Sequence, residues 1–149
     1  MVATLTVEPD HAERLDRSAR ELARAATLCR EAARLLETRP AAEVVNALAG
    51  IHERDLAHLQ RLTARLGLDA PTAAPTHDAL DELGRAQRRA GDAGVLAVVR
   101  EFEAAATRAY ERLRDEPALP GEFRTLARSA LDELHRRRRR LEGAARVAD

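Results

Sequence analysis

Three residues able to bind a metal ion repeat at a regular spacing, His52-x-x-Asp55-x-x-His58. On a helix these side chains share one face, with each histidine about 60° from Asp55. Asp55 also falls at the centre of the apolar stripe between Leu48 and Leu66. A carboxylate at that position must be paired, protonated or metal-bound, because burying an isolated charge is very costly. Imidazole and carboxylate together predict a zinc, iron or manganese site. The alternative is a buried Asp–His or Asp–Arg network that fixes the register of the helices.

A second acid-x-x-His pair, Asp132 and His135, occurs near the C-terminus. Two such pairs on different helices are typical of di-metal bundles, which also need a Glu from each remaining helix. The helical wheel places His135 at the edge of its apolar stripe and Asp132 nearly opposite that stripe. The segment before it offers Glu101 and Glu103 at stripe edges, and in the first segment Glu21 lies only at the edge of the stripe. The six-ligand set is incomplete, so a site for a single metal ion is the stronger of the two metal hypotheses.

The level of the candidate residues along the predicted helices favours one shared layer. Asp55, Glu103 and His135 all lie near the middle of their segments. Tyr110 lies seven residues after Glu103 on the same side, which predicts a packing and hydrogen-bond pair. The candidate ligands for iron, manganese or zinc are therefore His52, Asp55, His58, Glu103 and His135.

Two further features have a structural interpretation. Cys29 lies on the apolar stripe of the first segment and is predicted to be a small core residue. The run Arg136–Arg140 falls near the end of the last segment, where positive charge complements the helix dipole. An acidic partner for this run is the alternative.

Composition places these residues in a helical protein. Of 149 residues, 45% are hydrophobic, dominated by alanine and leucine, and only 2% are aromatic, too few β-formers for a sheet. The 25 basic and 25 acidic residues balance, which argues against a general nucleic-acid binder. A single cysteine excludes an intramolecular disulfide and favours a reducing compartment. No stretch approaches the ~20 apolar residues of a membrane span. We expect a cytoplasmic protein without a recognisable catalytic motif; a protein partner or a homo-oligomer is compatible with it.

Prolines and glycines divide the chain into helices at about 10–38, 40–66, 76–90, 92–115 and 120–142, with a loop at 69–75. Asp10 and Asp92 are the predicted N-caps, and Gly143 is expected to end the last helix. Each long segment has one apolar stripe, which predicts a single four-helix-bundle domain over residues 1–149. A short connection joins the first two long helices and another joins the last two, so each of these pairs is predicted to be antiparallel. The long connection from Leu68 to Gly91, with its short helix, favours the ferritin-like topology with one crossover.

Several stretches together resemble an uncharacterised bacterial family of four-helix-bundle proteins, a domain of unknown function in the ferritin-like superfamily. The similar stretches are CREAA, LQRLTARLGLDAP, EAAATRAY and LDELHRRRRRL, within residues 12–142. In that family the third long helix carries a Glu seven residues before a Tyr, and the fourth a late His. Glu103, Tyr110 and His135 match these positions, whereas the family's second acidic residue is Arg100 here. The resemblance implies a ferritin-like fold and a stress-associated context, but no reaction.

Overall fold

The computed structural model of the chain describes residues 9–68 and 77–148, and all regular structure within these ranges is α-helical. The helices are α1 (Pro9–Leu35), α2 (Arg39–Arg65), α3 (His77–Asp115) and α4 (Gly121–Ala148). The prediction of an all-α protein with four helices is therefore confirmed. The predicted loop at 69–75 lies outside the described residues.

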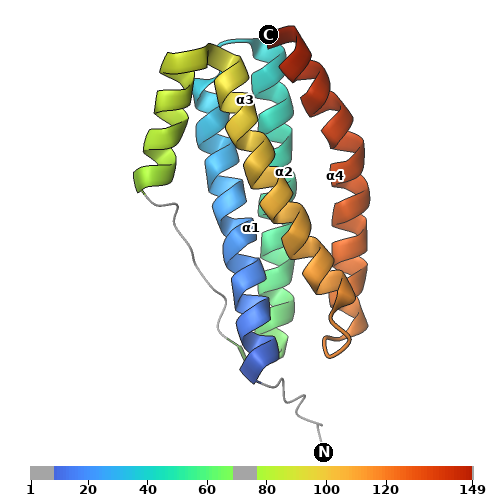
Figure 1. The fold of residues 1–149 in the computed structure, drawn as a ribbon. Helices are drawn as coiled ribbons and strands as arrows, with labels where there is room; N and C mark the ends of the chain where they lie inside the picture. The colour runs from blue at the N-terminus through green and yellow to red at the C-terminus, as the bar shows by residue number, and fades with distance from the viewer. Residues whose placement is uncertain (1–8, 69–76, 149) are drawn as a thin grey trace, which may run out of the picture.

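The helices form a bundle in which each long helix has two neighbours. Figure 1 shows α1 and α4 running in one direction and α2 and the long part of α3, residues 92–115, running in the other. Helix α1 packs against α2 and α3, and α4 packs against the same two helices. Helices α2 and α3 scarcely touch, so they are diagonal to each other. Every neighbouring pair is antiparallel, and residues 92–115 run parallel to α2.

Helix α3 bends sharply at Gly91, whose backbone has φ 62° and ψ −149°. A residue with a Cβ atom is strained in this conformation, so the position requires glycine. The predicted helices at 76–90 and 92–115 correspond to the two arms of this bend. Gly94 lies where the arms meet, and a Cβ there would come within 2.5 Å of the Ala86 carbonyl oxygen. The short arm can therefore fold back closely beside the start of the long arm (Figure 1).

The bend is tied to the α1–α2 connection by Asp92. Its carboxylate oxygens accept hydrogen bonds from the backbone N–H groups of Glu37 and Thr38, each at 2.9 Å, and from the Thr38 hydroxyl at 2.7 Å. Asp92 was predicted to cap its own helix, but these bonds hold a different segment. They also explain why α1 ends at Leu35 rather than near residue 38. The Thr38 backbone is extended, and α2 starts at the next residue with a proline in its first turn.

The other predicted boundaries differ at the two ends of the chain. Helix α1 begins at Pro9, so Asp10 lies inside its first turn instead of preceding it. Helix α4 continues to Ala148, because Gly143 adopts helical geometry and does not end it. Ala144 packs against the core and Ala145 is buried, so apolar contacts stabilise the extra turn.

The core is built largely from alanine and leucine. The buried face of α1 is rich in alanine, which lets neighbouring helices approach closely. The largest fully buried side chains are Tyr110 and Phe123. Within the described ranges, the helices are all too polar to cross a membrane.

Candidate metal centre

His52 lies at the centre of a polar cluster in the middle of the bundle, and its side chain is 0% exposed. Its Nε2 atom is 2.7 Å from Glu103 Oε1, and its Nδ1 atom is 3.3 Å from the Tyr110 hydroxyl oxygen. The rings of His52 and Tyr110 are nearly parallel, at an angle of 19°. Glu103 and Tyr110 are seven residues apart, two helical turns, so both project from one face of α3. Since α2 and α3 are diagonal, these contacts cross the bundle axis.

Cys29 of α1 adds a sulfur atom to this cluster. Its thiol donates a hydrogen bond to Glu103 Oε1, with a distance of 3.5 Å between sulfur and oxygen. One potential ligand atom each from Cys29, His52 and Glu103 lie within 4.8 Å of one another. These three residues come from three different helices. In the part of the chain that the structure describes, no other group of His, Cys, Asp and Glu meets this criterion.

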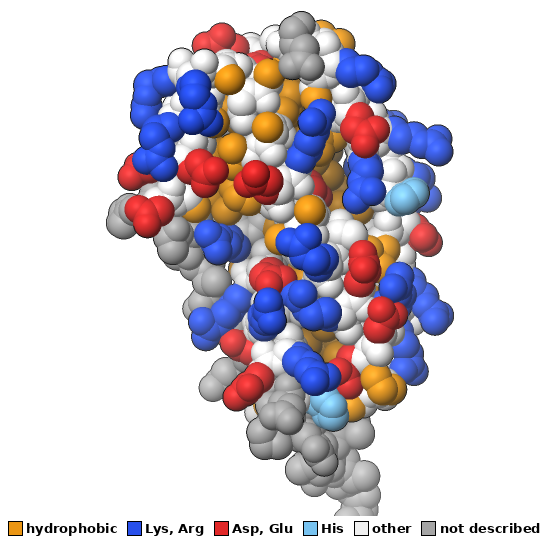
Figure 2. Space-filling model, in the orientation of Figure 1, with side chains coloured by type: hydrophobic (Ala, Val, Ile, Leu, Met, Phe, Trp, Pro, Cys, Tyr) orange, Lys and Arg blue, Asp and Glu red, His pale blue; other side chains and the backbone are white. Residues whose placement is uncertain are grey.

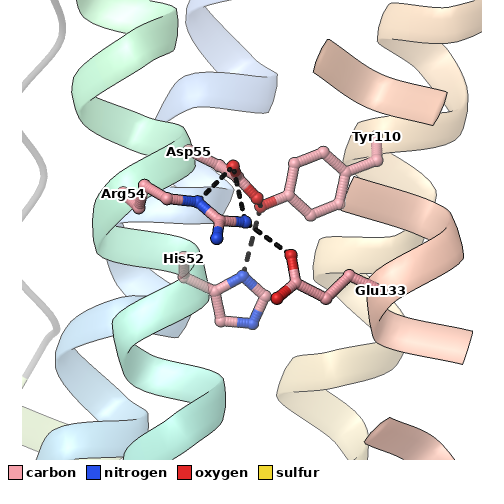
Figure 3. Close-up of polar contacts among 5 residues, drawn as sticks. All are labelled: His52, Arg54, Asp55, Tyr110 and Glu133. Carbon is pink, nitrogen blue, oxygen red and sulfur yellow. Dashed lines mark hydrogen bonds and ion pairs between the residues drawn. The ribbon is translucent and has the colours of Figure 1, made fainter. Parts of the chain in front are cut away.

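Asp55 is connected to His52 through Tyr110. The Tyr110 hydroxyl donates to Asp55 Oδ2 at 3.2 Å, and the Arg54 guanidinium lies 3.4 Å from Asp55 Oδ1. Figure 3 shows this guanidinium between the carboxylates of Asp55 and Glu133, and it also forms an ion pair with Glu133 of α4. The Arg54 side chain is 59% exposed. A continuous chain of hydrogen bonds and ion pairs therefore leads from the buried imidazole to the surface.

Burial dominates the electrostatics of the cluster. It raises the pKa of the Asp55 carboxyl above its usual value, although Arg54 and the Tyr110 hydroxyl favour the charged form. It raises the pKa of the Tyr110 hydroxyl well above its usual value, with the charge of Asp55 adding to the effect. The pKa of the Cys29 thiol is also raised well above its usual value, by burial first and by Glu103 second. Without a metal ion, the thiol and the phenol are therefore protonated.

The hydrogen-bond directions leave one place in the cluster for a positive charge. The Tyr110 hydroxyl has one hydrogen, which it donates to Asp55, so its oxygen accepts from an N–H at His52 Nδ1. In a neutral imidazole with the proton on Nδ1, the lone pair of Nε2 faces Glu103 Oε1 at 2.7 Å. Two lone pairs at that distance repel each other. One proton, held by either group, relieves this repulsion, and a metal ion could replace that proton if the two atoms moved apart.

The structure brings together three of the five predicted ligands. His52 and Glu103 are in contact, and Asp55 joins them through the Tyr110 hydroxyl. His58 is exposed on α2 and lies outside the cluster. His135 is exposed on α4. It lines a groove between α3 and α4 that Glu103 also lines, but its ring nitrogens are not among the potential ligand atoms that lie close together. The predicted five-ligand set is therefore not assembled around one point.

The other acidic residues that were weighed for a di-metal centre lie outside the cluster. Glu21 of α1 forms an ion pair with Arg112, and Glu101 is exposed. Asp132 is exposed beside His135 in the groove. Helix α1 thus supplies a thiol to the cluster, and not a carboxylate.

Sequence reasoning missed Cys29 and the pair Arg54 and Glu133. Cys29 was assigned to the core, where it does lie, but its sulfur also contacts Glu103. Its place on the apolar stripe of α1 was the available signal. The contact of Glu103 with Cys29 and His52 depends on how three helices rotate about their axes, which one-helix wheels do not specify.

A groove of about 870 Å³ opens between α3 and α4 beside the cluster. Leu48, Leu131, Leu134 and Leu141 line it, together with charged side chains that include Arg100 and Glu103. Figure 2 shows the same side of the molecule as Figure 1, with apolar side chains lying in recesses between arginine and acidic side chains. The Glu103 side chain is 13% exposed, whereas His52 and Cys29 are fully buried. Glu103 is therefore the member of the cluster that borders the groove.

Comparison with known proteins returned no match to a family model, to a curated protein or to a solved structure.

Proposed function

We propose that this protein is a ferritin-like helical bundle that binds one divalent transition-metal ion in its core through Cys29, His52 and Glu103. The observation that carries the proposal is the convergence of a sulfur, an imidazole nitrogen and a carboxylate oxygen within 4.8 Å. Each donor comes from a different helix, so bound metal would link α1, α2 and α3.

Two distances between the donors can be compared with those around a tetrahedral ion. Typical zinc–ligand bond lengths place a sulfur and an oxygen ligand about 3.5 Å apart, and a nitrogen and an oxygen about 3.3 Å apart. The Cys29 sulfur is 3.5 Å from Glu103 Oε1, and His52 Nε2 is 2.7 Å from the same oxygen. Binding therefore requires the imidazole and the carboxylate to separate by about half an ångström. The third pair of donors, the Cys29 sulfur and the His52 nitrogen, lies within 4.8 Å.

The donor set favours zinc or iron(II) over the other candidates. Thiolate and imidazole are ligands for zinc and iron, whereas manganese, magnesium and calcium prefer oxygen. A reducing cytoplasm, which the single cysteine favours, would keep this thiol available. Metal binding would displace the thiol proton, because the thiolate is the ligand.

The residues behind His52 match the usual support of a metal-bound histidine. A ligating imidazole normally donates its other N–H to a carboxylate or another acceptor, which fixes the ring and its tautomer. Here Nδ1 is next to the Tyr110 hydroxyl, which donates to Asp55. Arg54 in turn binds Asp55. The imidazole is thereby oriented with Nε2 toward Cys29 and Glu103.

The antiparallel neighbours and the parallel diagonal pair support a ferritin-like bundle, as does the resemblance carried by Glu103 and Tyr110. A di-metal oxidase or peroxidase is the weaker proposal. Such centres use a carboxylate from each helix, and α1 contributes Cys29 instead.

A structural role without metal is the second candidate, favoured by the hydrogen bonds that link Cys29, His52, Glu103 and Tyr110 directly. A buried polar network can fix the register of helices while adding little stability. In that case one proton occupies the position between His52 and Glu103.

Titration with cobalt(II), a spectroscopic substitute for zinc and iron(II), separates these candidates. The purified chain should bind one cobalt ion and develop the near-ultraviolet charge-transfer band of a cobalt–thiolate bond. Cys29→Ala should lose that band and weaken binding at least tenfold. His58→Ala and His135→Ala are matched controls, because both histidines are exposed and outside the cluster. Wild-type protein without a thiolate band, or with binding abolished by the control substitutions, would contradict the proposal.

A further inference from the structure

The three protein donors leave one side of the proposed site without a ligand. They come from α1, α2 and α3, and none comes from α4. A tetrahedral ion with three protein ligands keeps a fourth position for water or an exogenous ligand. Helix α4 forms one wall of the groove that borders Glu103, so this unfilled side faces the groove.

The groove has the dimensions and lining of an entry route for a small molecule. Its volume of about 870 Å³ is in the range of small-ligand sites. Ala104 and Thr107, one residue and about one turn beyond Glu103, line it and have short side chains. Access to the deeper donors runs past Glu103, since Cys29 and His52 are themselves fully buried.

Positive charge is available at the groove close to Glu103. Arg100 precedes Glu103 by three residues, so the two side chains are neighbours on α3. Arg100, Arg136 and Arg138 all line the groove, and none of them forms an ion pair with another described residue. Arg114, lower in the groove, is paired with Asp115. The carboxylates of Glu111, Asp132 and Glu142 also line the groove, so its charges nearly balance overall. An anion is favoured at the proposed site itself, because Arg100 places an unpaired positive charge one helical turn from Glu103.

We infer that the metal site keeps one coordination position open to the α3–α4 groove, and that this position takes a small monoanion such as a carboxylate or an inorganic anion. The inference rests on the proposed function, because the anion binds the metal that Cys29, His52 and Glu103 hold. Arg100 attracts the anion without contacting the metal, and is therefore a positioning residue.

The test uses azide as the probe and the full-length cobalt(II) protein. At constant ionic strength, azide should change the visible d–d bands of the bound cobalt with saturation, while the cobalt–thiolate band persists. Arg100→Gln should weaken azide binding by about two- to fivefold, the effect expected for one exposed charge. Its matched control is Arg128→Gln on α4, since Arg128 is exposed and outside the groove. Ala104→Phe fills the groove without removing a donor and should abolish the azide response.

The outcomes separate this inference from the function on which it rests. A cobalt–thiolate band that forms normally, together with d–d bands that azide does not change, would overturn the open position and leave metal binding intact. An azide response of wild-type strength in both Arg100→Gln and Ala104→Phe would overturn the groove as the route. Absence of the cobalt–thiolate band in the wild-type protein would overturn both proposals together.

Discussion

Replacement of Tyr110 by phenylalanine removes one oxygen atom from the centre of the buried network. That oxygen is 3.2 Å from Asp55 Oδ2 and 3.3 Å from His52 Nδ1, and the tyrosine side chain is 0% exposed. Phenylalanine retains the ring and its packing. The substitution therefore tests the hydrogen bonds with little change in volume.

The expected destabilisation follows from the two groups that lose a partner. A hydrogen bond to a charged acceptor contributes about 1.5–3 kcal/mol, and a buried polar group left unsatisfied costs about 1–3 kcal/mol. Asp55 retains Arg54 as a partner, which reduces its share, whereas no other protein partner is seen for His52 Nδ1 among the described residues. We expect Tyr110→Phe to lower the free energy of unfolding of the metal-free protein by about 2–4 kcal/mol.

Chemical denaturation, followed by circular dichroism, measures this change. Thr63→Val is the matched control, because it also deletes one buried hydroxyl from a side chain of nearly constant shape. The Thr63 hydroxyl donates only to the Leu59 carbonyl of its own helix, which keeps its backbone partner. The control should cost less than about 1 kcal/mol. Equal effects of the two substitutions, or a loss below about 0.5 kcal/mol for Tyr110→Phe, would refute the assignment of Tyr110 as the link between His52 and Asp55.

The same variant reports on metal binding. Loss of a group that orients a ligating histidine typically weakens metal binding by about 10- to 100-fold. We therefore expect Tyr110→Phe to bind cobalt(II) more weakly by that factor. An unchanged cobalt affinity alongside a large loss of stability would assign Tyr110 to a structural network alone.

Three further substitutions test other parts of the argument. Asp55→Leu leaves the buried Tyr110 hydroxyl without its acceptor, so metal-free stability should fall by about 1–3 kcal/mol, and cobalt affinity should fall as well; unchanged stability in a denaturant titration would contradict this. Gly91→Ala should lower the free energy of unfolding by about 1–3 kcal/mol, because the backbone angles are strained for alanine although there is space for the methyl group. The control Gly143→Ala, at a helical position, should leave stability unchanged or raise it. Burial favours the neutral form of Asp92, but the hydrogen bonds from Glu37 and Thr38 outweigh it and lower the pKa of its carboxyl. The stability due to Asp92 should therefore be complete above its unfolded pKa of about 4 and be lost as pH falls through the lower folded value; thermal melts of Asp92→Asn should lack this contribution at neutral pH.

The helical architecture could be predicted because each long segment has a continuous apolar stripe, and these stripes form the core. The boundaries were less predictable where tertiary contacts override local signals. Gly143 has the residue type of a helix end, yet the burial of Ala145 beyond it keeps α4 helical. Asp92 has the residue type of an N-cap, yet its carboxylate binds a connection more than fifty residues earlier in the chain.

The candidate site could be predicted in part, since a carboxylate at the centre of a stripe identifies the polar layer. His52 and His58 are equivalent on the wheel, about 60° to either side of Asp55. Only His52 is covered by neighbouring helices, and His58 faces solvent. A helical wheel gives the angle of a side chain about its own helix. It does not show which side of the apolar stripe a neighbouring helix covers. Cys29 was missed for the same reason, because its role depends on the reach of Glu103 from α3.

The charge balance of the cluster explains how one pocket can exist with and without metal. With one proton between them, His52 and Glu103 have no net charge as a pair, and Arg54 neutralises Asp55. A divalent ion would replace that proton and the Cys29 thiol proton, so the total charge of the core would not change. Because burial of net charge is the main cost of such a cluster, this exchange adds little to it. A carboxylate in place of Cys29 would instead leave an unpaired negative charge in the metal-free core, beside Glu103. A thiol on α1 therefore fits the proposed metal site better than a carboxylate would.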